Sequence, residues 1–119
     1  MISQFYKCNA NHNSFIIIPH YDTLDKKLFN CSKIKDICFK STKQIVDGFI
    51  LMNIKKNKIL MDYYNNDGNW ETFCLNGLIC CSLILNENHE KNNFEIISNN
   101  IKYKVEIIDN DFVKVGMKK

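Results

Sequence analysis

Hydrophobic and polar residues alternate at the start of the chain. The segment ISQFYKCN has a period of two, and SFIIIP follows it after ANHN. This pattern predicts paired strands at residues 2–9 and 14–18, with Asn13 at the rim of their turn. Apolar residues then recur near helical spacing between Thr23 and Cys38, with Asp25 early and lysines later. That stretch predicts a helix, because this charge order suits the helix dipole.

The middle and the end of the chain are typical of further strands. DGFILMNIKKNKILMDYY predicts a hairpin of strands at about 48–54 and 58–64 around a polar turn. NNDGN then favours a sharp reversal, so the second strand should stop near Tyr64. FEIIS, IKYKVEII and DFVKVGM add about three more strands.

The run LICCSLIL is apolar on nearly every face, and periodicity alone cannot separate a buried strand from a buried helix in so short a run. Because the surrounding segments are strands, we expect a helix from about Asn76 that the sheet wraps. The expected fold class is α+β, with a curled, mostly antiparallel sheet around one buried central helix. At 119 residues, one domain over residues 1–119 is expected.

Composition and charge narrow the function classes. The chain is 45% hydrophobic and 24% charged, as globular proteins are, and its net charge of +3 forms no basic stripe. We therefore expect no nucleic-acid partner. Apolar runs stay well short of the ~20 residues that span a bilayer, and the opening lacks the pattern of a signal peptide, so no membrane partner and a cytoplasmic location are expected.

The six cysteines could form a disulfide set in a secreted protein, but no export signal accompanies them, so reduced thiols are expected. Their spacing also disfavours a zinc site. No C-x-x-C pair occurs, and Cys80 directly precedes Cys81. We therefore expect no metal. Cys74 stands just before the predicted central helix, where unpaired N–H groups and the helix dipole stabilise a thiolate and can bind a carboxylate. That position suits proton abstraction beside a carboxylate, although a single cysteine is more often small apolar filler.

The stretch NNDGNWETFCLNGLICC resembles the N-D-G-S-x-x-x-x-C-G-N-G-x-R-C motif of diaminopimelate epimerases, enzymes of lysine and peptidoglycan precursor synthesis that use no cofactor. The matching residues are Asn65, Asp67, Gly68, Cys74, Asn76, Gly77 and Cys80. FYKCNANHNSFIII is similar to the family's amino-terminal motif, and IVDGFILM keeps the aspartate and glycine of a third. Nearly the whole chain is covered in order, which implies the N-terminal half of a two-domain fold with the second domain absent.

The resemblance implies that Cys74 is one of two cysteines acting as acid and base on opposite faces of the substrate's alpha carbon. The implied substrate-binding positions are Asn13, Asn65, Leu75, Asn76 and Gly77. Leu75 departs from the family, which has glycine there, and the arginine expected near Ile79 is missing. Glycine allows a close backbone approach, so Leu75 is expected to crowd the carboxylate pocket.

The implied function is interconversion of LL- and meso-diaminopimelate by cysteine acid/base proton transfer in lysine biosynthesis. One copy of the domain offers only Cys74, so we expect a homodimer or a separately encoded second half. The alternative is a degenerate, non-catalytic half-domain that binds an amino acid or a partner chain. An unrelated nucleic-acid-binding or scaffold domain is disfavoured by the diffuse charge.

Overall fold

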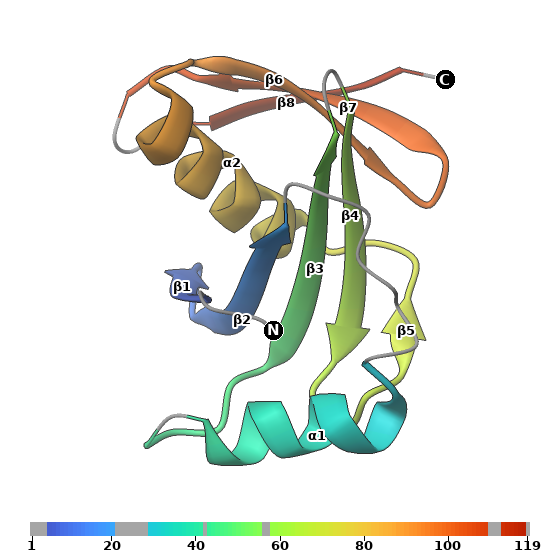
Figure 1. Ribbon diagram of the computed structural model, residues 1–119. Helices are drawn as coiled ribbons and strands as arrows, with labels where there is room; N and C mark the ends of the chain where they lie inside the picture. Colours follow the sequence, from blue (N-terminus) through green and yellow to red (C-terminus); the bar gives the residue numbers. More distant parts are fainter. Residues whose placement is uncertain (1–4, 21–28, 42, 56–57, 110–112, 119) are drawn as a thin grey trace.

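The computed structural model describes residues 5–20, 29–41, 43–55, 58–109 and 113–118 (Figure 1). In these ranges the chain forms an eight-stranded sheet and two α-helices. The strands are β1 (Tyr6–Ala10), β2 (Asn13–His20), β3 (Gly48–Lys55), β4 (Lys58–Asn65), β5 (Trp70–Glu71), β6 (Asn93–Ser98), β7 (Ile101–Ile107) and β8 (Val113–Lys118). The helices are α1 (Cys31–Lys40) and α2 (Leu75–His89).

The sheet is mixed and follows the order β1-β2-β3-β4-β6-β7-β8, with β5 paired to β4. Most neighbours are antiparallel, as predicted, including the hairpins β1–β2, β3–β4 and β6–β7. The pairs β2–β3 and β4–β6 are parallel, and the sequence pattern did not indicate them. Each parallel pair is joined by a connection that contains a helix, which is the usual requirement for parallel neighbours.

Two-residue turns that contain asparagine connect the strands of two hairpins. Asn11 and His12 have φ of 48° and 70° between β1 and β2, and Asn99 and Asn100 have φ of 50° and 64° between β6 and β7. Two consecutive positive φ values fit the twist of hairpin strands, and asparagine tolerates them better than most residues. The short polar segments ANHN and SNNI therefore set the register of the strands that they join.

The central apolar run forms α2, as expected. Its buried residues are Gly77, Leu78, Cys80, Cys81, Ser82, Ile84 and Leu85. Leu78, Cys80, Cys81, Ile84 and Leu85 pack with apolar side chains from β2, β3, β4, β6 and β7 in the larger of two core clusters. Ile79 and Leu83 are only half-buried, so the sheet does not cover every face of the helix. In Figure 1, α2 lies between the β1–β2 hairpin and the β6–β8 strands.

The structure describes the second part of the helix that was predicted between Thr23 and Cys38, and this part continues two residues past the predicted end, to Lys40. It begins at Cys31, because the Asn30 side chain accepts from the N–H of Lys33 at 2.8 Å and caps the helix. Phe29 precedes the cap, and the predicted start at Thr23 lies outside the described residues. Helix α1 packs on the opposite face of the sheet from α2, in the second core cluster. None of the described helices is long and apolar enough to span a membrane.

Candidate active site

Cys74 occupies the N-cap position of α2. Its backbone is extended, its carbonyl accepts from Leu78 N at 2.9 Å, and its Sγ accepts from Gly77 N at 3.4 Å. The first turn of a helix presents N–H groups that no residue of the helix can accept from, and the helix dipole makes this end positive. The predicted position of Cys74 just before the central helix is therefore found in the structure.

Hydrogen bonds between asparagine side chains join the start of α2 to the first hairpin. Asn76 Nδ2 donates to Asn13 Oδ1 at 2.6 Å, and Asn11 Nδ2 donates to Asn76 Oδ1 at 2.9 Å. Asn13 opens β2 and Asn76 lies in the first turn of α2, so the fold brings together two predicted site residues that are 63 positions apart. Asn76 lies two residues after Cys74, in the first turn of α2.

Asn65 is the last residue of β4 and is hydrogen-bonded to Tyr63 on the same strand. The Tyr63 hydroxyl donates to Asn65 Oδ1 at 3.0 Å, and Asn65 Nδ2 donates to Glu71 Oε1 at 2.9 Å. Burial is the main reason why the pKa of Tyr63 rises to about 12, and the charges of Cys74, Asp47 and Glu71 act in the same direction.

Gly77 and Leu75 differ in their surroundings. A Cβ on Gly77 would lie 2.6 Å from Ile50 Cδ1 and 3.3 Å from Met61 Cε, so glycine lets α2 approach the sheet closely. Its N–H already donates to the Cys74 sulfur. The Leu75 side chain is 50% exposed at the first turn, on the solvent side of the helix start.

Asp47 and Gly48, the aspartate and glycine of the third motif, have structural roles beside the candidate site. Asp47 Oδ2 accepts from Ser14 N at 2.8 Å and from Ser14 Oγ at 3.3 Å, which fixes the start of β2 beside β3. A Cβ on Gly48 would lie 2.6 Å from Tyr63 Cε1 and 3.0 Å from the Tyr64 carbonyl oxygen. Glycine is therefore needed at position 48 to seat the Tyr63 ring.

Three further thiols lie in or beside α2: Cys80 and Cys81 on the helix and Cys8 on β1. Cys8 on β1 hydrogen bonds with Cys80, and this contact lowers the pKa of the Cys8 thiol. The same contact, followed by burial, raises the pKa of Cys80, and burial is the main cause that raises the pKa of Cys81. All six cysteines are free. Within the described ranges, no three His, Cys, Asp or Glu side chains gather so that they could hold a metal ion.

Tyr63, which is hydrogen-bonded to Asn65, and Cys8, which contacts Cys80, were not singled out by the sequence reasoning. Tyr63 stands two positions before Asn65, so strand alternation places both on one face of β4. That alternation was a usable signal. Cys8 shares its face of β1 with Tyr6 and Ala10, but nothing in the sequence pointed from it to Cys80, because the contact depends on how α2 crosses the sheet.

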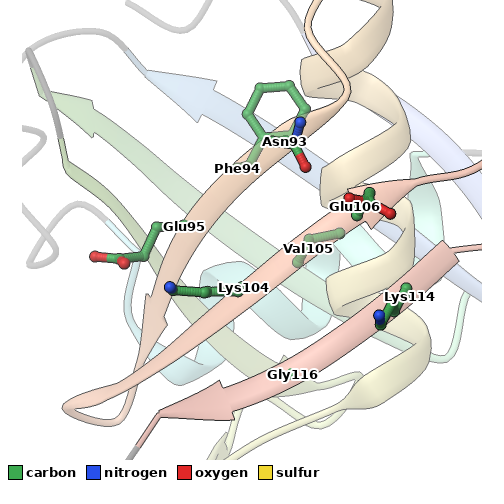
Figure 2. Close-up of a pocket in the computed structure, with 8 residues that line it drawn as sticks. All are labelled: Asn93, Phe94, Glu95, Lys104, Val105, Glu106, Lys114 and Gly116. Atoms are coloured by element: carbon green, nitrogen blue, oxygen red, sulfur yellow. The ribbon is translucent and has the colours of Figure 1, made fainter.

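A separate hollow of about 590 Å³ lies on β6, β7 and β8 (Figure 2), and no residue of α2 lines it. Its lining residues are Asn93, Phe94, Glu95, Lys104, Val105, Glu106, Lys114 and Gly116. None of the predicted site residues lines it. Its charged side chains alternate in sign across the strands, so it offers neither a thiol nor a field of one sign, and Cys74 remains the focus of the candidate site.

Comparisons with known proteins point to one enzyme family. A diaminopimelate epimerase from Prochlorococcus marinus (strain NATL2A) is 32% identical over 127 residues, covering 98% of this chain and 44% of that protein. One from Flavobacterium psychrophilum is 31% identical over 117 residues, covering 97% of this chain and 45% of that protein. The chain thus spans less than half the length of the curated relatives that it matches. No family model matches it.

Solved structures share the fold. A phenazine biosynthesis PhzC/PhzF protein from Clostridium difficile (strain 630) superposes with a TM-score of 0.66 at 7% identity, over 86% of this chain and 39% of that one. A PhzF family protein from Enterococcus faecalis gives a TM-score of 0.64 at 7% identity, over 92% of this chain and 41% of that one. Over nearly its whole length, the chain is therefore a partial relative of the diaminopimelate epimerases.

Proposed function

We propose that this domain is one half of a cofactor-independent amino-acid epimerase that interconverts LL- and meso-diaminopimelate. The observation that carries the proposal is the position of Cys74 at the N-cap of α2, with the hydrogen-bonded pair Asn13 and Asn76 beside it. A thiol at a helix start can ionise and act as a base, while the helix N–H groups attract the substrate carboxylate. In this scheme the side chains of Asn13 and Asn65 and the backbone amides at Asn76 and Gly77 orient the amino acid.

Epimerisation needs an acid and a base on opposite faces of one carbon, and Cys74 serves one face. In the proposal, the second group comes from another copy of the domain or from a second half of the enzyme. A two-fold arrangement would place two equivalent helix starts on either side of one substrate. Sedimentation of wild-type protein, alone and with diaminopimelate, would show whether copies of this chain pair with each other.

Leu75 favours a second candidate function, that of a non-catalytic half-domain that binds an amino acid or a partner chain. It replaces the family's glycine and leaves an apolar side chain 50% exposed at the helix start. A branched side chain there restricts close approach of a carboxylate to the backbone. This alternative predicts binding without proton exchange at the alpha carbon.

Protection of Cys74 from alkylation tests whether diaminopimelate occupies the site. Iodoacetamide labelling, read by mass spectrometry, would compare Cys74 with Cys31, an exposed thiol on α1 that serves as an internal reference. We expect diaminopimelate to slow labelling of Cys74 and to leave that of Cys31 unchanged. Equal labelling of Cys74 with and without the amino acid would contradict a bound substrate beside this thiol.

A further inference from the structure

A smaller hollow, of about 250 Å³, opens where β4 changes its neighbour in the sheet. Strand β3 occupies one edge of β4, so β5 and β6 share the other edge. There, residues 59–61 pair with β6, and Tyr63 and Tyr64 pair with β5. Asp62 lies between these two short ladders, and its side chain lines the hollow. The hollow is therefore a consequence of the gap between β5 and β6.

The polar side chains of this hollow lie on the other face of the sheet from Cys74. Asn53 follows Met52 on β3, and Asp62 precedes Tyr63 on β4, so strand alternation places each pair on opposite faces. Met52 and Tyr63 belong to the core cluster of α2, and Cys74 packs against the same cluster. The sheet therefore separates the hollow from the candidate active site.

Asn53 supplies the hollow with a hydrogen-bond acceptor that has no donor. The residue lines the hollow and is only 6% exposed. Its Oδ1 is buried, and no group of the described residues donates a hydrogen bond to it. Such atoms are few in native proteins, because a buried acceptor without a donor destabilises the fold. The last torsion of asparagine is broad, so the amide can turn this oxygen toward an N–H group that enters the hollow.

Charge and an aromatic ring favour a cation as the source of that N–H group. Among the described residues that line the hollow, Asp62 alone is charged. Its Oδ1 accepts from Trp70 Nε1 at 3.3 Å, which holds the indole beside the carboxylate. A carboxylate can accept further hydrogen bonds while it keeps this one. Trp70 is 45% exposed, and the face of an indole ring attracts a nearby cation.

We propose that this hollow binds the primary ammonium group of a small alkylamine. An ammonium group has three N–H donors, which Asp62 and Asn53 Oδ1 would accept, and its charge would be attracted by the Trp70 ring. Leu60 and Ile97, which are in register across β4 and β6, also line the hollow and offer apolar surface to the alkyl chain. The volume of about 250 Å³ is below the roughly 300 Å³ at which sites for drug-sized ligands begin, so a ligand of a few carbons fits best.

Trp70 reports directly on this site, because it is the only tryptophan in the sequence. Its fluorescence would be followed while the protein is titrated, at constant ionic strength, with n-butylamine, n-butanol or tetramethylammonium. We expect a saturable change with n-butylamine and none with uncharged n-butanol at the same concentrations. Tetramethylammonium is a cation without N–H donors, so it should bind at least about tenfold more weakly. Equal affinities for the two cations, or a change that does not saturate, would overturn the proposal.

Two variants test the residues that would hold the ammonium group. Asp62→Asn should weaken n-butylamine binding by about tenfold or more, whereas Asp36→Asn, which removes an exposed carboxylate from α1, should leave it unchanged. Equal binding by these two variants would overturn the role of Asp62.

Asn53→Leu should weaken n-butylamine binding by about three- to tenfold. Because the unpaired acceptor disappears, the urea midpoint should stay unchanged or rise. A lower midpoint with unchanged binding would make Asn53 a structural residue and would overturn the proposal. The titration does not involve Cys74, so its result is independent of whether the domain acts on diaminopimelate.

Discussion

Asn76 Nδ2 lies 2.6 Å from Asn13 Oδ1, so one hydrogen bond ties the first turn of α2 to the first residue of β2. The bond fixes the helix start, where Cys74 stands, against the hairpin β1–β2. Asn11 extends the contact by donating to Asn76 at 2.9 Å. The position of the candidate thiol therefore depends on amide pairing as well as on apolar packing.

Asn76→Ala tests this contact. We expect a loss of about 1 kcal/mol in the free energy of unfolding, because the exposed hydrogen bonds of Asn76 with Asn13 and Asn11 disappear. Diaminopimelate binding, measured by calorimetry, should weaken as well. Asn88→Ala is the matched control, since it removes an amide that contacts Tyr6 near the other end of the same helix. Equal effects of the two variants on binding would contradict a role for Asn76 at the site.

Gly68→Ala tests the turn that the N-D-G motif forms. Gly68 has φ of 92°, and a Cβ there would meet the backbone of Cys31, with the Cα only 2.7 Å away. We expect a loss of about 3 kcal/mol, since neither the backbone conformation nor the neighbour can adjust cheaply. Gly116→Ala, with no atom within 4 Å of the added Cβ, should change stability by less than about 0.5 kcal/mol. Urea unfolding would measure both, and similar losses would contradict the described packing of the turn on α1.

Leu75→Gly tests whether the leucine crowds the carboxylate site. We expect tighter binding of diaminopimelate, because glycine opens the backbone N–H groups of the helix start to an anion. Since the side chain is half-exposed, little packing should be lost. Leu75→Ala is the control that shortens the side chain without adding the same backbone freedom. Calorimetry that found unchanged or weaker binding in both variants would show that Leu75 is not the obstacle.

Stability should fall at alkaline pH, and Cys38 should contribute to the fall. Burial raises the pKa of Cys38 from 9.0 to about 11, so the folded state holds its proton to higher pH than the unfolded state does. The contribution is fully present below pH 9 and is lost as pH rises toward 11. Urea unfolding between these pH values should therefore show a shallower decline in Cys38→Ala than in wild type. An equally steep decline would assign the effect to other groups.

Much of the fold could be predicted from the sequence because local patterns determine it. Period-two alternation located the hairpin strands, and the NNDGN turn adopts the positive φ at Gly68 that such a reversal requires. The two parallel pairings could not be read, because they depend on which strand edges meet after each helix has crossed the sheet. The two-residue strand β5 was also missed, being too short to show a period.

At the candidate site, too, local features could be predicted and contacts between distant segments could not. The N-cap position of Cys74 follows from local sequence, since Leu75 begins the apolar helix directly after it. Asn76 and Asn13 were predicted to belong to one site, but their hydrogen bond could be seen only in the folded structure.

Exchange of the alpha proton of diaminopimelate in deuterated water is the most direct test of the central claim, that Cys74 is an acid/base at the alpha carbon. The reaction needs only one competent thiol, and mass spectrometry or proton NMR would follow deuterium entering the alpha position. We predict exchange with wild-type protein, abolished in Cys74→Ala and preserved in Cys31→Ala. Exchange that persists in Cys74→Ala, or its absence from wild-type protein that binds diaminopimelate, would contradict the account.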